Sequence, residues 1–172
     1  MTLYYSHMET AIGPLLIAGD ENAVHWIVFP KDGRAAPPEA GWVESARGPV
    51  GEAMRQLHEY FSGARTSFDL PLAPQGTMFQ CAVWRQLSEI PYAQTISYGE
   101  LAKRVGNPKA SRAVGAANGK NPLPIVVPCH RVIGANGTLT GFGGGLPVKQ
   151  ALLELERETA ARSIGNRAVA HG

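Results

Sequence analysis

The sequence predicts an α+β fold in which a small antiparallel β-sheet with one helix precedes a mostly helical region. Three observations support this prediction. Short apolar runs alternate with turn residues up to residue 33, an apolar pattern of helical spacing follows near residue 50, and helical patterns dominate after residue 76. At 172 residues the chain has the length of one domain or two small ones, since domains average about 150 residues.

The first 75 residues are predicted to form an acidic N-terminal domain. Apolar runs at residues 3–5, 15–18 and 24–29 are separated by Gly, Pro, Asp and Asn, which is typical of an antiparallel meander. Spacings of four, three and four predict one buried helix face made of Val50, Met54, Leu57 and Phe61. A short strand at residues 67–70 is expected to close this domain.

Residues 76–159 are predicted to form the second domain, after a linker rich in Pro and Gly. A helix over residues 79–87 is followed by a capping box, Ser97 to Glu100, which opens a helix through Val105. The pair Asn107-Pro108 then predicts the start of another helix over residues 109–118. Two short helices joined by a tight turn match a helix-turn-helix. The last helix is expected over residues 148–159, and residues 160–172 are expected to form a flexible tail.

Charge is distributed unevenly along the chain. Residues 1–75 carry five Lys or Arg against nine Asp or Glu, whereas residues 76–172 carry eleven against five. Between residues 98 and 131 six cations face a single acid, Glu100. A basic stretch on a helix-turn-helix favours contact with a polyanion, and a solvated surface is the alternative.

Composition excludes several classes of protein. Apolar residues make up 44% of the chain, which excludes a disordered protein. No apolar run approaches 18 residues and the first 20 residues lack the pattern of a signal peptide, so neither a membrane span nor secretion is expected. Cys81 and Cys129 are the two cysteines, which indicates a cytoplasmic thiol protein rather than a disulfide scaffold.

Residues 121–132 carry the strongest chemical signal. Three prolines stiffen an apolar run that ends in Cys129, His130 and Arg131. A thiol becomes a nucleophile when a neighbouring base or cation stabilises its thiolate, although neighbours on an extended chain point apart and a bridging water is then needed. The alternative for Cys129 is that it is a small buried apolar residue without a chemical role. We predict that structural role for Cys81. The glycine-rich loop at residues 134–145 lacks the ending of a phosphate-binding loop, and the Cys and His spacings predict no metal.

The segment Ile125-Val126-Val127-Pro128-Cys129-His130-Arg131 resembles the active-site signature of the O6-alkylguanine-DNA alkyltransferases. The resemblance covers nearly all of residues 77–158, including Ile96-Ser97-Tyr98, Gly106-Asn107-Pro108-Lys109, Arg112-Ala113-Val114-Gly115, Asn121-Pro122, Gly143-Gly144-Gly145-Leu146 and Leu152-Leu153. The acidic first half resembles the variable N-terminal domain of that family. The resemblance implies transfer of an alkyl group from guanine O6, and from thymine O4, to Cys129, once per molecule and without a cofactor.

The resemblance also implies a role for each catalytic residue. His130 takes the thiol proton through a water, and Glu156 orients the imidazole, chosen over Glu154 and Glu158 by the motif alone. Tyr98 protonates N3 of the leaving guanine, and Asn121 holds the turn before Cys129. In the substrate pocket, the carbonyls of Cys129 and Val132 contact the exocyclic amine, the Gly143 N–H faces O6, and Phe142 stands where some members have a tyrosine.

Contact with duplex DNA follows from the same resemblance. Arg112 replaces the flipped nucleotide in the base stack, and Ala113 and Gly115 let their helix lie close to the minor groove. Lys103, Lys109 and Lys120 are expected at the phosphates, and Arg131 is also expected to contact DNA. The chain is expected to be a cytoplasmic monomer without DNA. A lesion-binding module that does not repair and a thiol hydrolase are the competing hypotheses.

Overall fold

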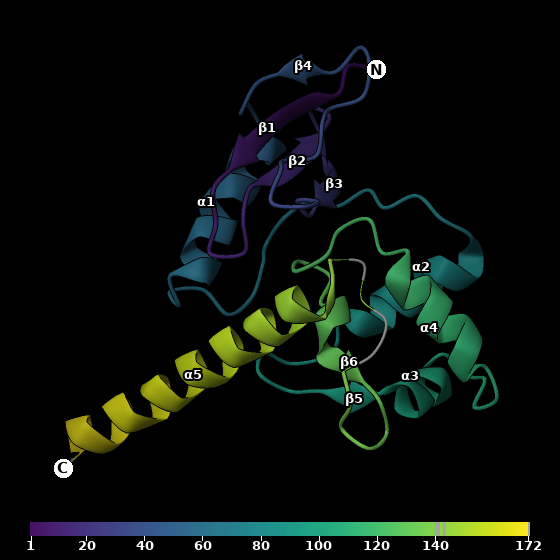
Figure 1. Ribbon diagram of the computed structural model, residues 1–172, viewed down its shortest axis with the longest axis vertical. Helices are drawn as coiled ribbons and strands as arrows, with labels where there is room; N and C mark the ends of the chain where they lie inside the picture. The colour runs from purple at the N-terminus through teal and green to yellow at the C-terminus, as the bar shows by residue number, and fades with distance from the viewer. Residues whose placement is uncertain (140–141, 143, 172) are drawn as a thin grey trace.

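A four-stranded sheet with one helix lies beside a cluster of shorter helices, and a long C-terminal helix starts near β6 (Val132–Ile133) and projects away from both (Figure 1). This computed structural model describes residues 1–139, 142 and 144–171. The sheet consists of β1 (Tyr4–Met8), β2 (Leu15–Gly19), β3 (Val24–Val28) and β4 (Val43–Glu44), in the order β3-β2-β1-β4. The predicted antiparallel meander of β1, β2 and β3 is confirmed, and β4 adds an unpredicted edge that is parallel to β1.

The predicted strand at residues 67–70 is wrong. Gln56, which is buried on helix α1 (Pro49–Phe61), donates to the carbonyl of Asp69 at 2.9 Å and accepts from its N–H at 2.9 Å. This side-chain amide takes the hydrogen bonds that a neighbouring strand would make. The sheet contact forms two residues later, as an isolated bridge between Val24 and Leu72.

Helix α1 is present as predicted, but its buried face is rotated. Val50 and Leu57 are buried, whereas Met54 and Phe61 are only partly buried. Their places are taken by Ala53 and Tyr60, each with no exposed surface. The spacing of the apolar residues therefore identified the helix but missed Tyr60, which is fully buried.

The helical region begins with α2 (Met78–Leu87), capped by a reciprocal bond pair between Thr77 and Gln80. The indole N–H of Trp84 donates to the carbonyl of Ala117 at 2.8 Å, which fixes α2 against α4 (Ser111–Gly119). The short parallel strands β5 (Ile96–Ser97) and β6 (Val132–Ile133) join the start of α3 (Tyr98–Arg104) to the cysteine segment.

Two predicted helix boundaries need correction. Asn107 accepts from the N–H of Ala110 at 3.0 Å and so closes a turn, which makes Ala110 the N-cap and delays α4 to Ser111. Helix α5 (Leu146–His171) continues through the residues that were expected to form a tail. Good helix formers such as Ala160, Ala161 and Arg162 sustain a helix without a strong apolar period. Mobility of this end and the domain boundary at residue 75 stay predictions.

Two contacts tie the N-terminal sheet to the cysteine segment. The N–H of Ile27 on β3 donates to the carbonyl of Pro122 at 2.9 Å. The ring of Phe29 packs against Phe142 with centroids 5.4 Å apart. The apolar core is continuous from the sheet through Leu57 to Val132 and Leu152. In the described ranges, the helices are not long and apolar enough for any of them to cross a membrane.

Candidate active site

Cys129 begins a single 3-10 turn, η1 (Cys129–Arg131), at the end of a tightly held loop. Asn121 donates from Nδ2 to the carbonyl of Val127 at 2.8 Å and accepts from the N–H of Leu123 at 3.0 Å. Ile125, inside this loop, has a φ of 74°, a left-handed conformation that costs energy for a β-branched residue. Asn121 thus lies where the resemblance placed it, tying the loop that presents the cysteine.

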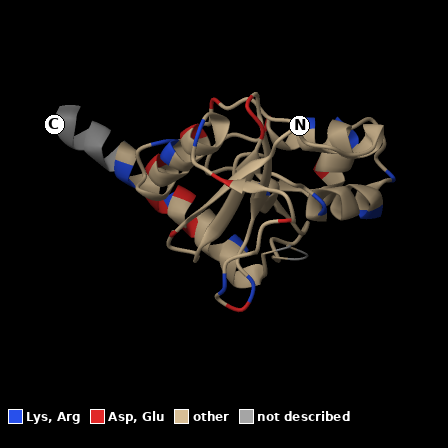
Figure 2. Cartoon of the chain, turned by 90° about the horizontal axis from the view of Figure 1, so that it is seen from above, with Lys and Arg blue, Asp and Glu red and all other residues tan. Residues whose placement is uncertain are grey.

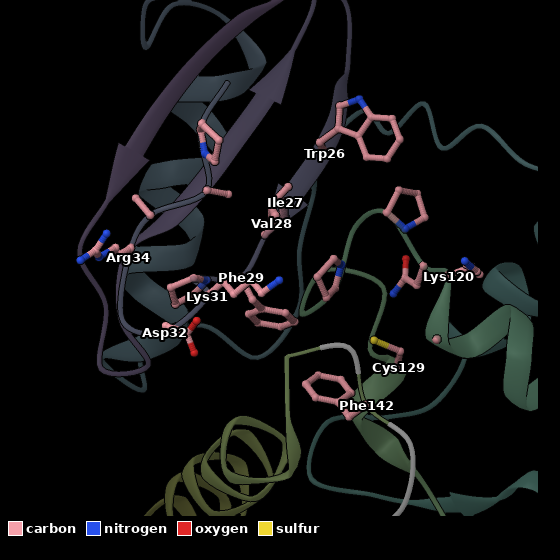
Figure 3. Close-up of a pocket in the computed structure, with 18 of the residues that line it drawn as sticks. Trp26, Ile27, Val28, Phe29, Lys31, Asp32, Arg34, Lys120, Cys129 and Phe142 are labelled. Carbon is pink, nitrogen blue, oxygen red and sulfur yellow. The ribbon is translucent and has the colours of Figure 1, made fainter. Parts of the chain in front are cut away.

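The thiol lies at the inner end of a cleft of about 1130 Å³ between the sheet and the cysteine segment. Trp26, Phe29, Pro122 and Pro124 line this cleft. Figure 3 shows Phe142 near Cys129. Only 4% of Cys129 is exposed, so access to Sγ is through this cleft. The apolar lining near the sulfur and the charges of the rim suit a flat ligand with an apolar substituent.

Burial raises the pKa of the Cys129 thiol to about 11, although Asn121 and Lys149 act against this rise. Desolvation penalises the thiolate, because the sulfur has lost the water that would stabilise its charge. The resting cysteine is therefore a thiol at neutral pH. A nucleophilic role requires a base that removes its proton as the reaction proceeds.

His130 directly follows Cys129 in the sequence and is therefore the neighbouring base. It has no exposed surface, and its ring is bonded to Glu156. Its Nε2 lies 2.5 Å from Oε2 of Glu156, which is also fully buried. Within the described part of the chain, Nδ1 of His130 has no hydrogen-bond partner. Since Glu156 fixes the proton on Nε2, Nδ1 is the nitrogen that is able to accept a proton.

The negative charge of Glu156 is balanced by the positive charge of Arg131, beside a neutral His130. Burial opposes ionisation of Glu156, but hydrogen bonds from His130 and Arg131 lower its pKa to about 2. Burial lowers the pKa of His130 below its usual value, against the opposing effect of Glu156. A neutral imidazole, a carboxylate and the guanidinium of Arg131 are therefore the forms present at neutral pH.

The prediction that Arg131 contacts DNA needs correction. Its Nε and Nη2 donate to the two oxygens of Glu156 at 2.8 and 3.0 Å, and Nη1 donates to the carbonyl of Ile90 at 2.8 Å. The guanidinium also lies 5.5 Å from the ring centroid of Tyr92, and the residue is only 6% exposed. Each of its three nitrogens donates to a group inside the protein, so Arg131 positions Glu156 rather than a phosphate.

Tyr60 completes the surroundings of Glu156 and was not identified from the sequence. Its hydroxyl donates to Oε2 of Glu156 at 2.6 Å from a position 96 residues earlier in the chain. The N–H of Ala93 donates to Oε1 at 3.1 Å. Since Tyr60 belongs to α1, the N-terminal domain contributes a side chain to the buried cluster of His130, Arg131 and Glu156.

Lys149 and Asn118 were also missed, and each binds a backbone carbonyl of the cysteine segment. The ammonium of Lys149 donates to the carbonyl of Val132 at 2.5 Å, and Nδ2 of Asn118 donates to that of Cys129 at 3.3 Å. Burial lowers the pKa of Lys149, with Cys129 acting in the opposite direction. The helical spacing of Lys149, Leu152 and Glu156 on one buried face was the available signal.

Tyr98 begins α3 and is partly buried against α4. A Cβ at Gly115 would lie 3.7 Å from the Tyr98 ring, an ordinary van der Waals distance, so Tyr98 packs beside α4 at Gly115. The Lys149 ammonium lies 5.8 Å from the Tyr98 ring centroid and 6.0 Å from that of Phe142. The rings of Tyr98 and Phe142 therefore both lie near the ammonium of Lys149, which also binds the Val132 carbonyl. Gly143 lies outside the described residues.

The predicted DNA-contact residues lie together on the helices of the second domain. Arg112 and Ala113 are exposed on α4, Lys103 is exposed on α3, and Lys109 and Lys120 flank α4. The described hydrogen bonds and ion pairs leave the side chains of these cations unused. Figure 2 shows basic residues with few acids over this helical end of the molecule. Among the residues described, no group of His, Cys, Asp and Glu has the arrangement of a metal site.

Comparisons with known proteins cover both halves of the chain. Residues 3–74 match the ribonuclease-like domain of 6-O-methylguanine DNA methyltransferase, and residues 78–158 match its DNA-binding domain. The methylated-DNA–protein-cysteine methyltransferase of Methanosarcina acetivorans is 54% identical over 154 residues, covering 90% of this chain and 98% of its own. That of Mycobacterium tuberculosis is 47% identical, covering 94% and 97%. A crystal structure of M. tuberculosis OGT in complex with DNA superposes with a TM-score of 0.84 at 45% identity, covering 91% of this chain and 94% of that one.

Proposed function

Because this chain belongs to the 6-O-methylguanine DNA methyltransferase family, we propose that Cys129 is the residue that accepts the alkyl group. The chain is a DNA-repair enzyme that transfers an alkyl group from DNA to a cysteine of its own. The observation that supports Cys129 is its position in the cleft, next to a neutral buried His130 that is held by Glu156.

The proposed reaction is a single displacement at the alkyl carbon. Nδ1 of His130 accepts the thiol proton through one water molecule, and the imidazolium is stabilised by Glu156. The sulfur attacks the carbon on O6, an S–C bond forms, and the C–O bond breaks with its electron pair moving into the guanine ring. Tyr98 then gives a proton to N3, so that guanine leaves as a neutral base. The thioether has no route back to a thiol, and each molecule therefore acts once.

We further propose that O6-alkylguanine is read in the cleft by backbone carbonyls. Lys149 and Asn118 orient the carbonyls of Val132 and Cys129, which then accept from the exocyclic amine of guanine. The Cys129 oxygen also accepts from the N–H of Val132, so the exocyclic amine shares this oxygen with the donors that already bind it. Phe142 offers a ring for stacking but no hydroxyl.

The target atom lies inside a stacked duplex, so the nucleotide must leave the helix at a cost of about a few kcal/mol. Arg112 occupies the vacated place, while Ala113 and Gly115 allow α4 to enter the minor groove. Lys103, Lys109 and Lys120 bind phosphates without reading sequence. We also propose that the chain is a monomer without DNA and that it acts in the cytoplasm.

The test compares wild type with Cys129→Ala on an oligonucleotide that carries one O6-methylguanine. Loss of the methyl group from DNA is measured in single turnover, and binding is measured in the same samples. Wild type should restore guanine with a stoichiometry of one, and Cys129→Ala should bind the lesion without repairing it. Repair by Cys129→Ala would overturn the proposal, and binding without repair by wild type would favour a lesion-recognition module.

A further inference from the structure

Tyr60 places a buried hydroxyl on the oxygen of Glu156 that His130 also uses. The two bonds to Oε2 measure 2.6 Å from the Tyr60 hydroxyl and 2.5 Å from Nε2 of His130. Nη2 of Arg131 is a third donor to this oxygen, at 3.0 Å. Three donors therefore share one carboxylate oxygen, and the strength of each bond affects the other two.

The hydroxyl acts as the donor in this bond. A carboxylate accepts only, and the low pKa of Glu156 keeps it ionised at neutral pH. Burial and the adjacent negative charge of Glu156 raise the pKa of Tyr60 well above its usual value, so the phenol keeps its proton. The bond to Glu156 persists over the pH range in which His130 changes its protonation.

Packing alone accounts for the ring of Tyr60 but not for its hydroxyl. The ring lies 5.3 Å from that of Phe61, 5.6 Å from Phe68 and 6.4 Å from Tyr92, between centroids. A phenylalanine would fill the same space. A buried hydroxyl costs energy unless it is hydrogen-bonded, and the bond it makes here is to the catalytic cluster.

We propose that Tyr60 is a positioning residue through which the N-terminal domain sets the orientation and basicity of His130. This inference depends on the proposed role of His130 as the base for Cys129. By donating to Oε2, Tyr60 spreads the charge of Glu156 and limits how strongly the carboxylate favours the imidazolium. Tyr60 thereby keeps His130 neutral, and ready to accept the thiol proton, at physiological pH.

The groups that face His130 come from four elements, and their charges are fixed around neutral pH. Glu156 and Lys149 come from α5, Arg131 and Cys129 from η1, and Tyr60 from α1. Tyr92, from the connection between α2 and β5, faces the same cluster through its ring. Of these groups, Tyr60 is the one whose bond to Glu156 is lost when a single oxygen atom is removed from its side chain.

Tyr60→Phe tests this inference, with Tyr92→Phe as the matched control. Tyr92 also has a buried hydroxyl near the cluster, yet the described bonds to Glu156 do not include it. The transfer rate is measured in single turnover, with a saturating O6-methylguanine oligonucleotide, between pH 5.5 and 9. For Tyr60→Phe we expect the acid limb of the profile to move up by about half a pH unit or more, because His130 holds a proton to higher pH. Tyr92→Phe should follow wild type.

Two further variants keep the test independent of folding. Replacement of Tyr60 by 3-fluorotyrosine retains the hydroxyl and makes it a stronger donor, so the acid limb should move to lower pH. In a Glu156→Gln background, Tyr60→Phe should leave the pH profile where it is, because the carboxylate through which it acts is gone. An equal loss of rate at every pH, or an equal shift in Tyr92→Phe, would overturn the inference. A wild-type protein that fails to transfer the methyl group would instead refute the proposed function.

Discussion

Nε2 of His130 lies 2.5 Å from Oε2 of Glu156, and neither side chain has any exposed surface. The bond joins the turn that begins with Cys129 to the long helix α5. It fixes the imidazole so that Nδ1 is the free nitrogen, and it supplies the negative charge that an imidazolium needs.

Glu156→Gln should slow methyl transfer about 10²-fold or more, within the usual range for loss of general acid–base assistance. The change keeps the size of the side chain and removes its charge. It also leaves Arg131 buried without its ion pair, which should lower the free energy of unfolding by about 3–5 kcal/mol. Transfer rates and urea unfolding measure the two effects. Glu158→Gln, on the exposed side of α5, is the control and should match wild type.

Stability should fall as the solution is made acidic. Folding lowers the pKa of Glu156 from its ordinary 4.5 to about 2, so its contribution is complete above pH 4.5 and is lost as the pH falls toward 2. The difference corresponds to about 3 kcal/mol. His130 adds to this trend, because its lowered pKa means that only the unfolded chain binds its proton just below pH 6.5. Urea unfolding between pH 3 and 8 measures the slope, and a stability that rises toward acid would contradict the charge states assigned here.

Arg112→Ala should slow repair of duplex DNA more than reaction with free O6-benzylguanine. Only the duplex requires a nucleotide to be flipped out and its place to be filled. Single-turnover rates on the two substrates give the ratio directly. Arg47→Ala, an exposed arginine of the N-terminal domain, is the control and should change neither rate. Equal losses of rate on both substrates would show that Arg112 does not stack in place of the flipped nucleotide.

Lys103→Ala, Lys109→Ala and Lys120→Ala should each make binding less dependent on salt. A lysine that neutralises one phosphate contributes about one unit to the slope of log K against log[salt] for duplex DNA. Binding is measured by fluorescence anisotropy from about 50 to 200 mM salt, the range over which counterion release is readily resolved. A variant with the wild-type slope identifies a lysine that contacts no phosphate.

The elements that local patterns specify were predictable from the sequence. The alternation of apolar runs and turns gave β1, β2 and β3. Ser97 does cap α3 through the N–H of Glu100, but the Glu100 side chain pairs with Arg104 instead of completing the predicted capping box. The prediction of a strand at residues 67–70 was wrong because the distant side chain of Gln56 makes the backbone hydrogen bonds that a neighbouring strand would make. The predicted end of α5 was wrong because helix propensity, rather than an amphipathic pattern, sustains its last turns.

The catalytic cluster was only partly predictable, for a similar reason. Cys129 and His130 are adjacent in a distinctive motif, whereas Tyr60 joins Glu156 from 96 residues away and reads in the sequence as an ordinary core aromatic. Arg131 reads as a surface cation, and only its pairing with buried Glu156 shows that it points inward. Side chains that act through tertiary contacts leave little local signal.

Mass spectrometry of the intact protein, followed by peptide mapping, identifies the residue that accepts the methyl group. The protein is incubated with excess oligonucleotide that carries one O6-methylguanine. We expect a gain of one methyl group, located on the peptide that holds Cys129 and saturating at one per molecule. An unchanged mass while the DNA is bound, or a methyl group on Cys81, would contradict it.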